Sequence, residues 1–83
     1  MIRKTWAFTF GFGHRYPNSY IEMEDMTMGE SRALMFEVYE KKWSFQYELD
    51  DKFKEDVKKY NLRLIRKFVR EDLKEFNIEE EKE

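Results

Sequence analysis

The most constraining feature of the sequence is a stretch near its start in which large aromatic residues alternate with small ones. The large residues are Trp6, Phe8, Phe10 and Phe12, and the small ones are Thr5, Ala7, Thr9 and Gly11. A period of two is the pattern of a β-strand, because successive side chains of a strand point to opposite faces. We expect the aromatic face to enter the core. The small face leaves room for a helix, a ligand or a partner to come close.

Two further segments complete the predicted sheet. Residues 13–19 are rich in turn-forming types, and residues 20–25 are typical of a second strand, so an antiparallel hairpin is expected. A third, half-buried strand is indicated by a second alternation, whose large residues are Trp43, Phe45, Tyr47 and Leu49. From these patterns we expect a core that includes Phe8, Phe10, Phe45, Tyr47, Met35 and Tyr39.

Helix signals separate and follow these strands. Thr27 and Glu30 have the spacing of a capping box, so a helix should start there and run to about residue 42. Asp50 or Asp51 can cap a second helix. Asn61 tolerates the left-handed conformation that ends helices, but the apolar spacing beyond it also fits a helix that continues. The prediction is an α+β fold, ββαβα, with a three-stranded antiparallel sheet packed on helices and a break or bend near Asn61.

The size and composition of the chain limit how many domains it can form and which chemistry it can carry out. Its 83 residues allow one domain, which we place at residues 1–78, followed by an acidic tail at 79–83 without apolar residues that we expect to be disordered. The sequence has no cysteine and one histidine, which argues against disulfides, metal ligation and haem cofactors. No segment has the length of a membrane span. We therefore expect a cytoplasmic protein without a cofactor.

Charge is distributed unevenly along the last third of the chain. The net charge is −2, but residues 52–70 hold eight basic and two acidic residues, and residues 71–83 hold seven acidic and two basic ones. On a continuous helix, one cationic ridge would be formed by Lys59, Arg63, Arg66 and Arg70. Such a ridge is a candidate nucleic-acid contact, and its alternative is a solvated helix face.

The hairpin loop is the second candidate site. Residues 11–13 begin like a glycine-rich phosphate loop but lack the third glycine and the following helix. The polar residues that could bind an anion, a nucleotide or another small ligand there are His14, Arg15, Tyr16 and Asn18, and the alternative is a solvated loop. His14 has no acidic neighbour in sequence to orient it, so we expect no catalytic site and no enzyme.

Two motifs connect the chain to a group of known proteins. Residues 6–11, Trp-Ala-Phe-Thr-Phe-Gly, and residues 42–47, Lys-Trp-Ser-Phe-Gln-Tyr, flank a charged helix. Over residues 5–60 the chain resembles small uncharacterised proteins encoded by phages and prophages of Gram-positive bacteria. The resemblance implies a mobile-element context, in which small proteins commonly act by binding a host component.

The expected function is therefore that of a non-enzymatic protein-interaction module whose partner is a host or phage protein, with inhibition of a host defence component as one outcome. Nucleic-acid binding through the ridge and small-ligand binding at the loop are the alternatives. Short aromatic-rich domains also tend to leave apolar patches and sheet edges uncovered. We therefore expect a homodimer.

Overall fold

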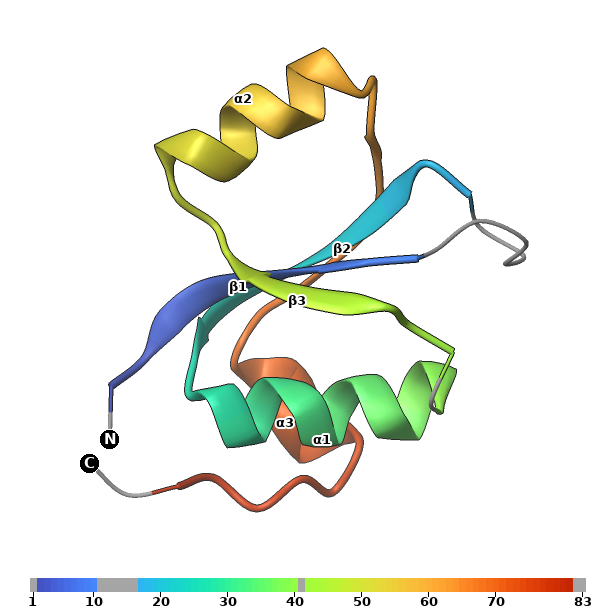
Figure 1. Ribbon diagram of the computed structural model, residues 1–83. Coiled ribbons are helices and arrows are strands. Elements are labelled where there is room, and N and C mark those ends of the chain that lie inside the picture. The colour runs from blue at the N-terminus through green and yellow to red at the C-terminus, as the bar shows by residue number, and fades with distance from the viewer. Residues whose placement is uncertain (1, 11–16, 41, 82–83) are drawn as a thin grey trace.

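The computed structural model describes residues 2–10, 17–40 and 42–81 (Figure 1). In chain order its elements are β1 (Lys4–Thr9), β2 (Ser19–Met26), α1 (Met28–Tyr39), β3 (Phe45–Glu48), α2 (Asp51–Lys59), β4 (Arg63–Phe68) and α3 (Glu71–Glu75). The expected α+β class is confirmed. The expected three-stranded antiparallel sheet is wrong in detail, because the sheet has four strands in the order β3-β1-β2-β4, and β4 runs parallel to β2.

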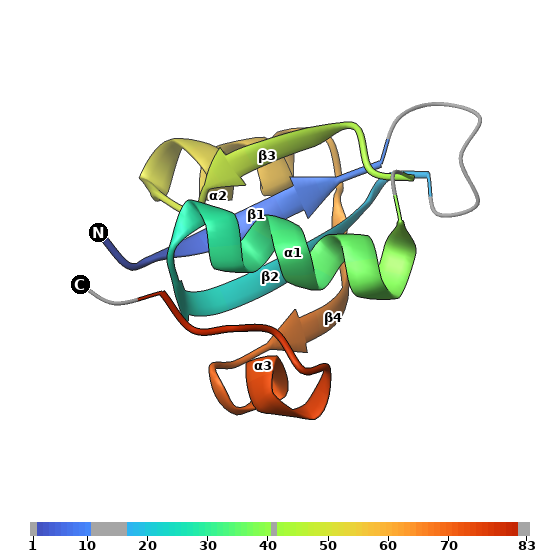
Figure 2. The same ribbon diagram turned by 90° about the horizontal axis from the view of Figure 1, so that it is seen from below.

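The sheet is covered on both faces. Helices α1 and α3 lie on one face and α2 lies on the other (Figure 1). Viewed from below, β3 and β4 occupy the two opposite margins of the sheet (Figure 2). Both edge strands run in the same direction, since both β2 and β3 are antiparallel to β1. Helix α2 therefore carries the chain across the sheet from one margin to the other.

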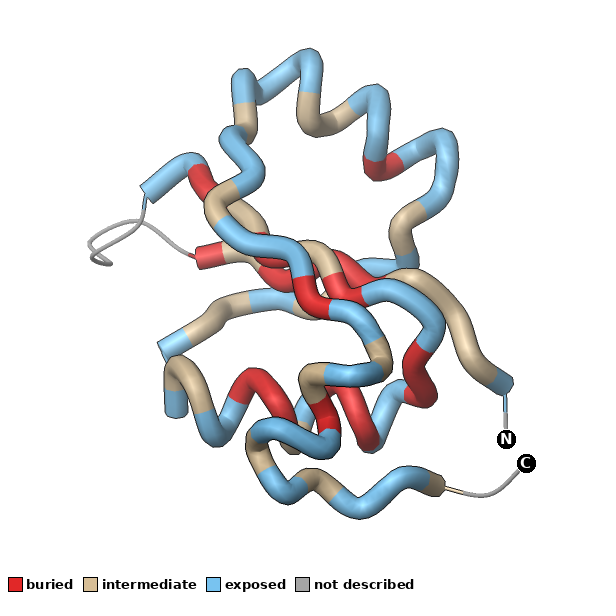
Figure 3. The backbone as a smooth tube through the Cα atoms, turned by 180° about the vertical axis from the view of Figure 1, so that it is seen from behind, coloured by how far each residue is buried: buried red, intermediate tan, exposed pale blue. Residues whose placement is uncertain are grey.

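The main core lies between the sheet and α1. The aromatic face of β1 enters it as predicted, and Phe8 is completely buried while Phe10 is 7% exposed. Phe8 packs edge-on against Trp43, with ring centroids 5.0 Å apart, and Phe10 packs against Tyr39 at 5.6 Å. Buried residues gather along the two central strands and on the sheet-facing side of α1 (Figure 3). The alternation in β1 thus determines which face of the sheet becomes the core.

The capping box that starts α1 is present as predicted. The Thr27 hydroxyl accepts the Glu30 N–H at 3.1 Å, and the Glu30 carboxylate accepts the Thr27 N–H at 2.8 Å. These two bonds satisfy two of the amide donors that a helix start leaves open. Helix α1 follows directly from Met28.

The chain breaks at Asn61, as one of the two alternatives expected. Asn61 has a positive φ of 53°, and the Leu62 N–H donates to the Val57 carbonyl at 2.9 Å, which is the hydrogen bond of a left-handed helix end. The helix does not resume beyond this point. The expected bent C-terminal helix is wrong, because residues 63–68 form strand β4.

A bulge explains why the sequence of β4 resembles that of a helix. Leu64 pairs with Tyr20 and Arg66 pairs with Ile21, so Ile65 is an extra residue in the strand. An extra residue shifts the side-chain alternation by one position. Apolar residues on the two sides of the bulge then fall at spacings that resemble helical periodicity.

Candidate functional site

Strand β3 presents its aromatic side chains on the face opposite the main core. Phe45 is 61% exposed and Tyr47 is 41% exposed, so the prediction that both are buried against α1 is wrong. The reason lies in the pairing with β1, which puts Gln46 beside Phe8 on the α1 side of the sheet. There the Gln46 amide donates to the Ser31 hydroxyl at 2.9 Å and its carbonyl oxygen accepts from Arg32 at 2.6 Å. The side of β3 that faces α1 is therefore polar, and the aromatic side that we expected in the core faces away from α1.

The rings on the α2 side form a continuous row across the sheet. Phe45 lies 6.1 Å from Tyr47, and Phe53 of α2 lies 5.4 Å from Tyr47 and 5.5 Å from Tyr20, measured between ring centroids. Tyr47 belongs to β3 and Tyr20 to β2, so Phe53 spans β1, which lies between these strands. The small Ala7 of β1 is completely buried there. The small-residue face of β1 therefore receives a helix, which was one of the expected occupants.

Two further apolar side chains are exposed, one on β4 and one at the end of α2. Leu64 of β4, beside Tyr20 in register, is 43% exposed, and Tyr60 at the end of α2 is 59% exposed. We use the name apolar face for the four exposed residues on β3, β4 and the end of α2, which are Phe45, Tyr47, Tyr60 and Leu64. Contacts between rings hold Tyr47 in place through Phe53, which is only 4% exposed. The β3 part of the apolar face is therefore anchored to buried structure.

The described residues line several hollows, and two of them border β1 or β3. The smaller, of about 220 Å³, lies between β3 and α2 and is lined by Tyr47, Glu48, Asp50, Lys52, Phe53 and Asp56. The larger, of about 520 Å³, is lined by Ile2, Lys4, Trp6, Thr27, Met28, Gly29 and Glu81. Two polar groups that line the larger hollow already have partners within the protein, since Lys4 pairs with Glu48 and the Thr27 hydroxyl caps α1. The larger hollow therefore offers few free polar groups to orient a small ligand.

The predicted cationic ridge does not form on a helix. Arg63 and Arg66 belong to strand β4, and Lys59 ends α2. The Lys59 ammonium lies 5.3 Å from the ring centroid of Tyr60, and the Arg66 guanidinium lies 4.4 Å from that of Phe68. Among the described residues, no acidic side chain pairs with Lys59 or Arg63.

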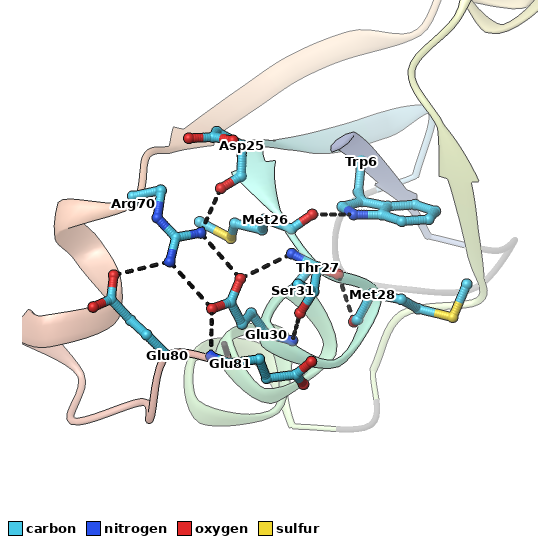
Figure 4. Close-up of polar contacts among 10 residues, drawn as sticks. All are labelled: Trp6, Asp25, Met26, Thr27, Met28, Glu30, Ser31, Arg70, Glu80 and Glu81. Carbon is cyan, nitrogen blue, oxygen red and sulfur yellow. Dashed lines mark hydrogen bonds and ion pairs between the residues drawn. The ribbon is translucent and has the colours of Figure 1, made fainter. Parts of the chain in front are cut away.

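Arg70, the fourth ridge residue, points into the protein. Its guanidinium donates to both carboxylate oxygens of Glu30, at 3.1 and 3.2 Å, to the Asp25 carbonyl at 2.7 Å and to the Glu80 carboxylate at 2.9 Å (Figure 4). The side chain is only 17% exposed. Arg70 therefore serves a structural ion pair in this conformation and is not presented to a phosphate.

The environment of Glu30 stabilises its charged form. Burial alone would raise the pKa of this carboxyl, but the hydrogen bonds from Arg70 and from the Thr27 and Glu81 amides, together with the positive charge of Arg70, outweigh it. They lower the pKa from 4.5 to about 2. Glu80 and Glu81, which belong to the acidic tail, both take part in this cluster, the latter through its N–H at 2.8 Å from the Glu30 carboxylate. Residues 82–83 lie outside the described residues.

The hairpin-loop site is described only at Asn18. This residue has a positive φ of 55°, and its carbonyl accepts the Arg63 N–H at 2.9 Å, so its backbone links the loop to β4. His14, Arg15 and Tyr16 lie outside the described residues. Sequence reasoning missed both the exposure of Phe45 and Tyr47 and the Glu30–Arg70 pair. Placing β3 at the edge of the sheet would have indicated the exposure of Phe45 and Tyr47. No local sequence pattern indicates the Glu30–Arg70 pair, because the two residues are 40 positions apart.

In the part of the chain that the structure describes, no helix has the length and apolar character needed to cross a membrane. The Asp and Glu side chains of this part of the chain include no group of three or more arranged to hold a metal ion. No protein-family model matches the chain, and comparison with curated proteins and with solved structures found no similar protein. The function must therefore be argued from the geometry.

Proposed function

We propose that this protein is a non-enzymatic protein-interaction module that binds its partner through the apolar face. The observation that carries the proposal is the exposure of Phe45 and Tyr47, at 61% and 41%, on a ring row anchored by the buried Phe53. Rigid aromatic side chains lose little conformational entropy on binding and are enriched at the centres of protein interfaces. A small domain needs its large apolar residues for its own core. Leaving these outside is consistent with their use in binding.

The charges of residues 57–70 favour a protein partner over a nucleic acid. Of the six basic residues in 57–70, Lys67 pairs with Glu22 and Glu24, and Arg70 pairs with Glu30. Nucleic-acid affinity comes largely from many simultaneous phosphate contacts. Arg63 and Arg66 pair in register with Ser19 and Ile21, on the α1 side of the sheet and opposite the apolar face. Lys59, which lies over the Tyr60 ring, is suited to the polar rim of an interface with an acidic border on the partner.

The partner class follows from the resemblance to phage and prophage proteins. It favours a host protein, such as a defence component, and inhibition as the consequence of binding. An inhibitor of this size needs no catalytic group, because occupying a functional surface of the host protein is sufficient.

The test compares a variant of the apolar face with a matched surface variant. Phe45→Ser combined with Tyr47→Ser removes the two exposed rings of β3, and Phe36→Ser removes a ring that is 54% exposed on α1, on the other side of the sheet. A host protein captured by the wild type is purified and its affinity measured by calorimetry. We expect the double variant to bind at least about tenfold more weakly and Phe36→Ser to bind within about twofold of wild type.

Two results would count against the proposal. Equal affinity of the wild type and the double variant would show that the apolar face is not the interface. Purified protein with excess absorbance at 260 nm that is lost on Lys59→Ala combined with Arg63→Ala would support the nucleic-acid alternative instead.

A further inference from the structure

The two edge strands of the sheet differ in how they are protected against pairing with another strand. Strand β4 contains a bulge at Ile65 and three basic residues, both of which discourage edge-to-edge association. Strand β3 has neither protection. Its sequence is Phe-Gln-Tyr-Glu, and its register with β1 runs without a shift. β3 also lies at the outer margin of the sheet (Figure 2).

The outward-pointing backbone groups of β3 can be assigned from its pairing with β1. The Leu49 N–H donates to the Thr5 carbonyl at 2.8 Å, so Leu49 faces β1 with its backbone. Backbone direction alternates along an antiparallel strand, so Tyr47 and Phe45 also face β1. The N–H and C=O groups of Gln46 and the N–H of Glu48 therefore point to the free edge, where they can bond to an added strand, while the Glu48 carbonyl already accepts the Asp50 N–H at 2.9 Å.

We propose that a second copy of this chain pairs antiparallel with β3 across a two-fold axis centred at Gln46. The two four-stranded sheets then join into one sheet of eight strands. The inference rests on the backbone edge and is independent of the partner proposed for the apolar face. In the dimer, the rings of Phe45 and Tyr47 from both copies lie on the same side, so the two apolar faces become one.

Charge and side-chain matching support a second copy as the occupant. Lys42 precedes β3, whereas Glu48, Asp50 and Asp51 lie at or beyond its end. Antiparallel self-pairing brings the basic start of one copy to the acidic end of the other, and parallel pairing would bring like charges together. Centring at Gln46 also places Phe45 opposite Tyr47 of the second copy, an aromatic cross-strand pair.

Introduced cysteines test the contact and its register together. The chain has no cysteine, so a single one can form a disulfide only between copies. Gln46→Cys places the two thiols directly opposite across the axis, where Cα atoms about 5.5 Å apart fall within the range that disulfides span. Arg63→Cys, at the start of the other edge strand, is the matched control. We expect Gln46→Cys to form a covalent dimer under mild oxidation and Arg63→Cys to form none, although its copies still pair non-covalently through β3.

A charge pair tests the same register without covalent chemistry. Ser44 lies opposite Glu48 of the second copy, so Ser44→Lys should tighten dimerisation and Ser44→Glu should weaken it. We expect a change of roughly threefold or more in the dimer dissociation constant in each direction, because the two-fold symmetry forms the pair between residues 44 and 48 twice in each dimer. Sedimentation equilibrium over a range of concentrations measures both variants and the wild type, with circular dichroism to verify folding. A wild type that stays monomeric throughout, or cross-linking at Arg63→Cys equal to that at Gln46→Cys, would overturn the inference.

Discussion

Arg70 forms a bidentate ion pair with Glu30 across 40 residues of sequence. The Glu30 side chain is fully buried and also caps the start of α1, so the pair fixes the segment before α3 to the beginning of α1. A buried carboxylate of this kind is stable only while its donors remain in place. The pair is therefore a point at which single substitutions should have large effects.

Arg70→Met is expected to be strongly destabilising. It removes both guanidinium bonds and leaves the Glu30 carboxylate buried without its cation, which costs about 3 to 5 kcal/mol of unfolding free energy in comparable pairs. Arg63→Met is the control, because Arg63 is exposed on β4 and forms no ion pair among the described residues, so a change within about 0.5 kcal/mol is expected. Urea unfolding of both variants measures the difference. Similar losses for the two would show that the buried pair contributes little.

The stability of the protein should depend on pH through Glu30. Its pKa of about 2 in the folded state lies below the value of 4.5 that it has when unperturbed. The unfolded state therefore binds the proton first as pH falls, and the stabilisation is complete above about pH 5 and lost as pH falls through 2. The shift corresponds to roughly 3 kcal/mol at about 1.4 kcal/mol per pKa unit.

Glu30→Gln isolates this contribution from that of the other carboxyls. The variant should be less stable than wild type at neutral pH, and the gap in unfolding free energy should narrow by roughly 3 kcal/mol between pH 5 and pH 2. Denaturant unfolding at several pH values measures the gap. A gap that stays constant over this range would mean that Glu30 titrates normally in the folded protein.

Local patterns predicted the elements whose causes are local. The capping box of Thr27 and Glu30 involves residues three positions apart, and it placed the start of α1 correctly. The alternation along β1 likewise identified both the strand and its core face, because β1 is a central strand with neighbours on both sides. Such features need no knowledge of the rest of the fold.

The wrong predictions all depend on tertiary placement. The alternation in β3 predicted a strand. Which face of an edge strand is covered depends on where the helices pack, and the face that carries Phe45 is exposed. Strand β4 was not predicted because the bulge at Ile65 adds one residue, which shifts the side-chain alternation that indicates a strand. The four residues of the candidate ridge do not share a helix, because Arg63 and Arg66 belong to β4. The last of them, Arg70, pairs with Glu30, and sequence spacing does not reveal this pair.

Two phenylalanines on the two faces of the sheet should differ sharply in their contribution to stability. Phe8 is completely buried against Trp43, so Phe8→Ala should cost about 3 to 5 kcal/mol and leave a cavity. Phe45 is 61% exposed, so Phe45→Ala should cost less than about 1 kcal/mol. Thermal melting of both variants measures the contrast. A large loss for Phe45→Ala would mean that the apolar face is covered in solution.

The left-handed backbone at Asn61 should tolerate glycine and reject a β-branched residue. Its φ of 53° is accessible to glycine without strain, so Asn61→Gly should change stability by less than about 0.5 kcal/mol. Asn61→Val should cost about 1 to 3 kcal/mol, because a β-branched side chain is strained in this region. Unfolding free energies of the two variants decide the matter. Equal stability would show that α2 does not end in this conformation.

Gly29 offers a test of how firmly the end of the described chain is held. A methyl group at this position would meet the carboxylate of Glu81, and no other neighbouring group stands as close. That carboxylate is the far end of a flexible side chain and can swing aside, while the Glu81 N–H keeps its bond to Glu30. Gly29→Ala should therefore stabilise the protein by up to about 1 kcal/mol, because alanine loses less backbone entropy than glycine when α1 forms. Thermal unfolding measures the sign. A destabilised Gly29→Ala variant whose stability is restored by adding Glu81→Ala would show that the carboxylate cannot move and that this segment packs rigidly on α1.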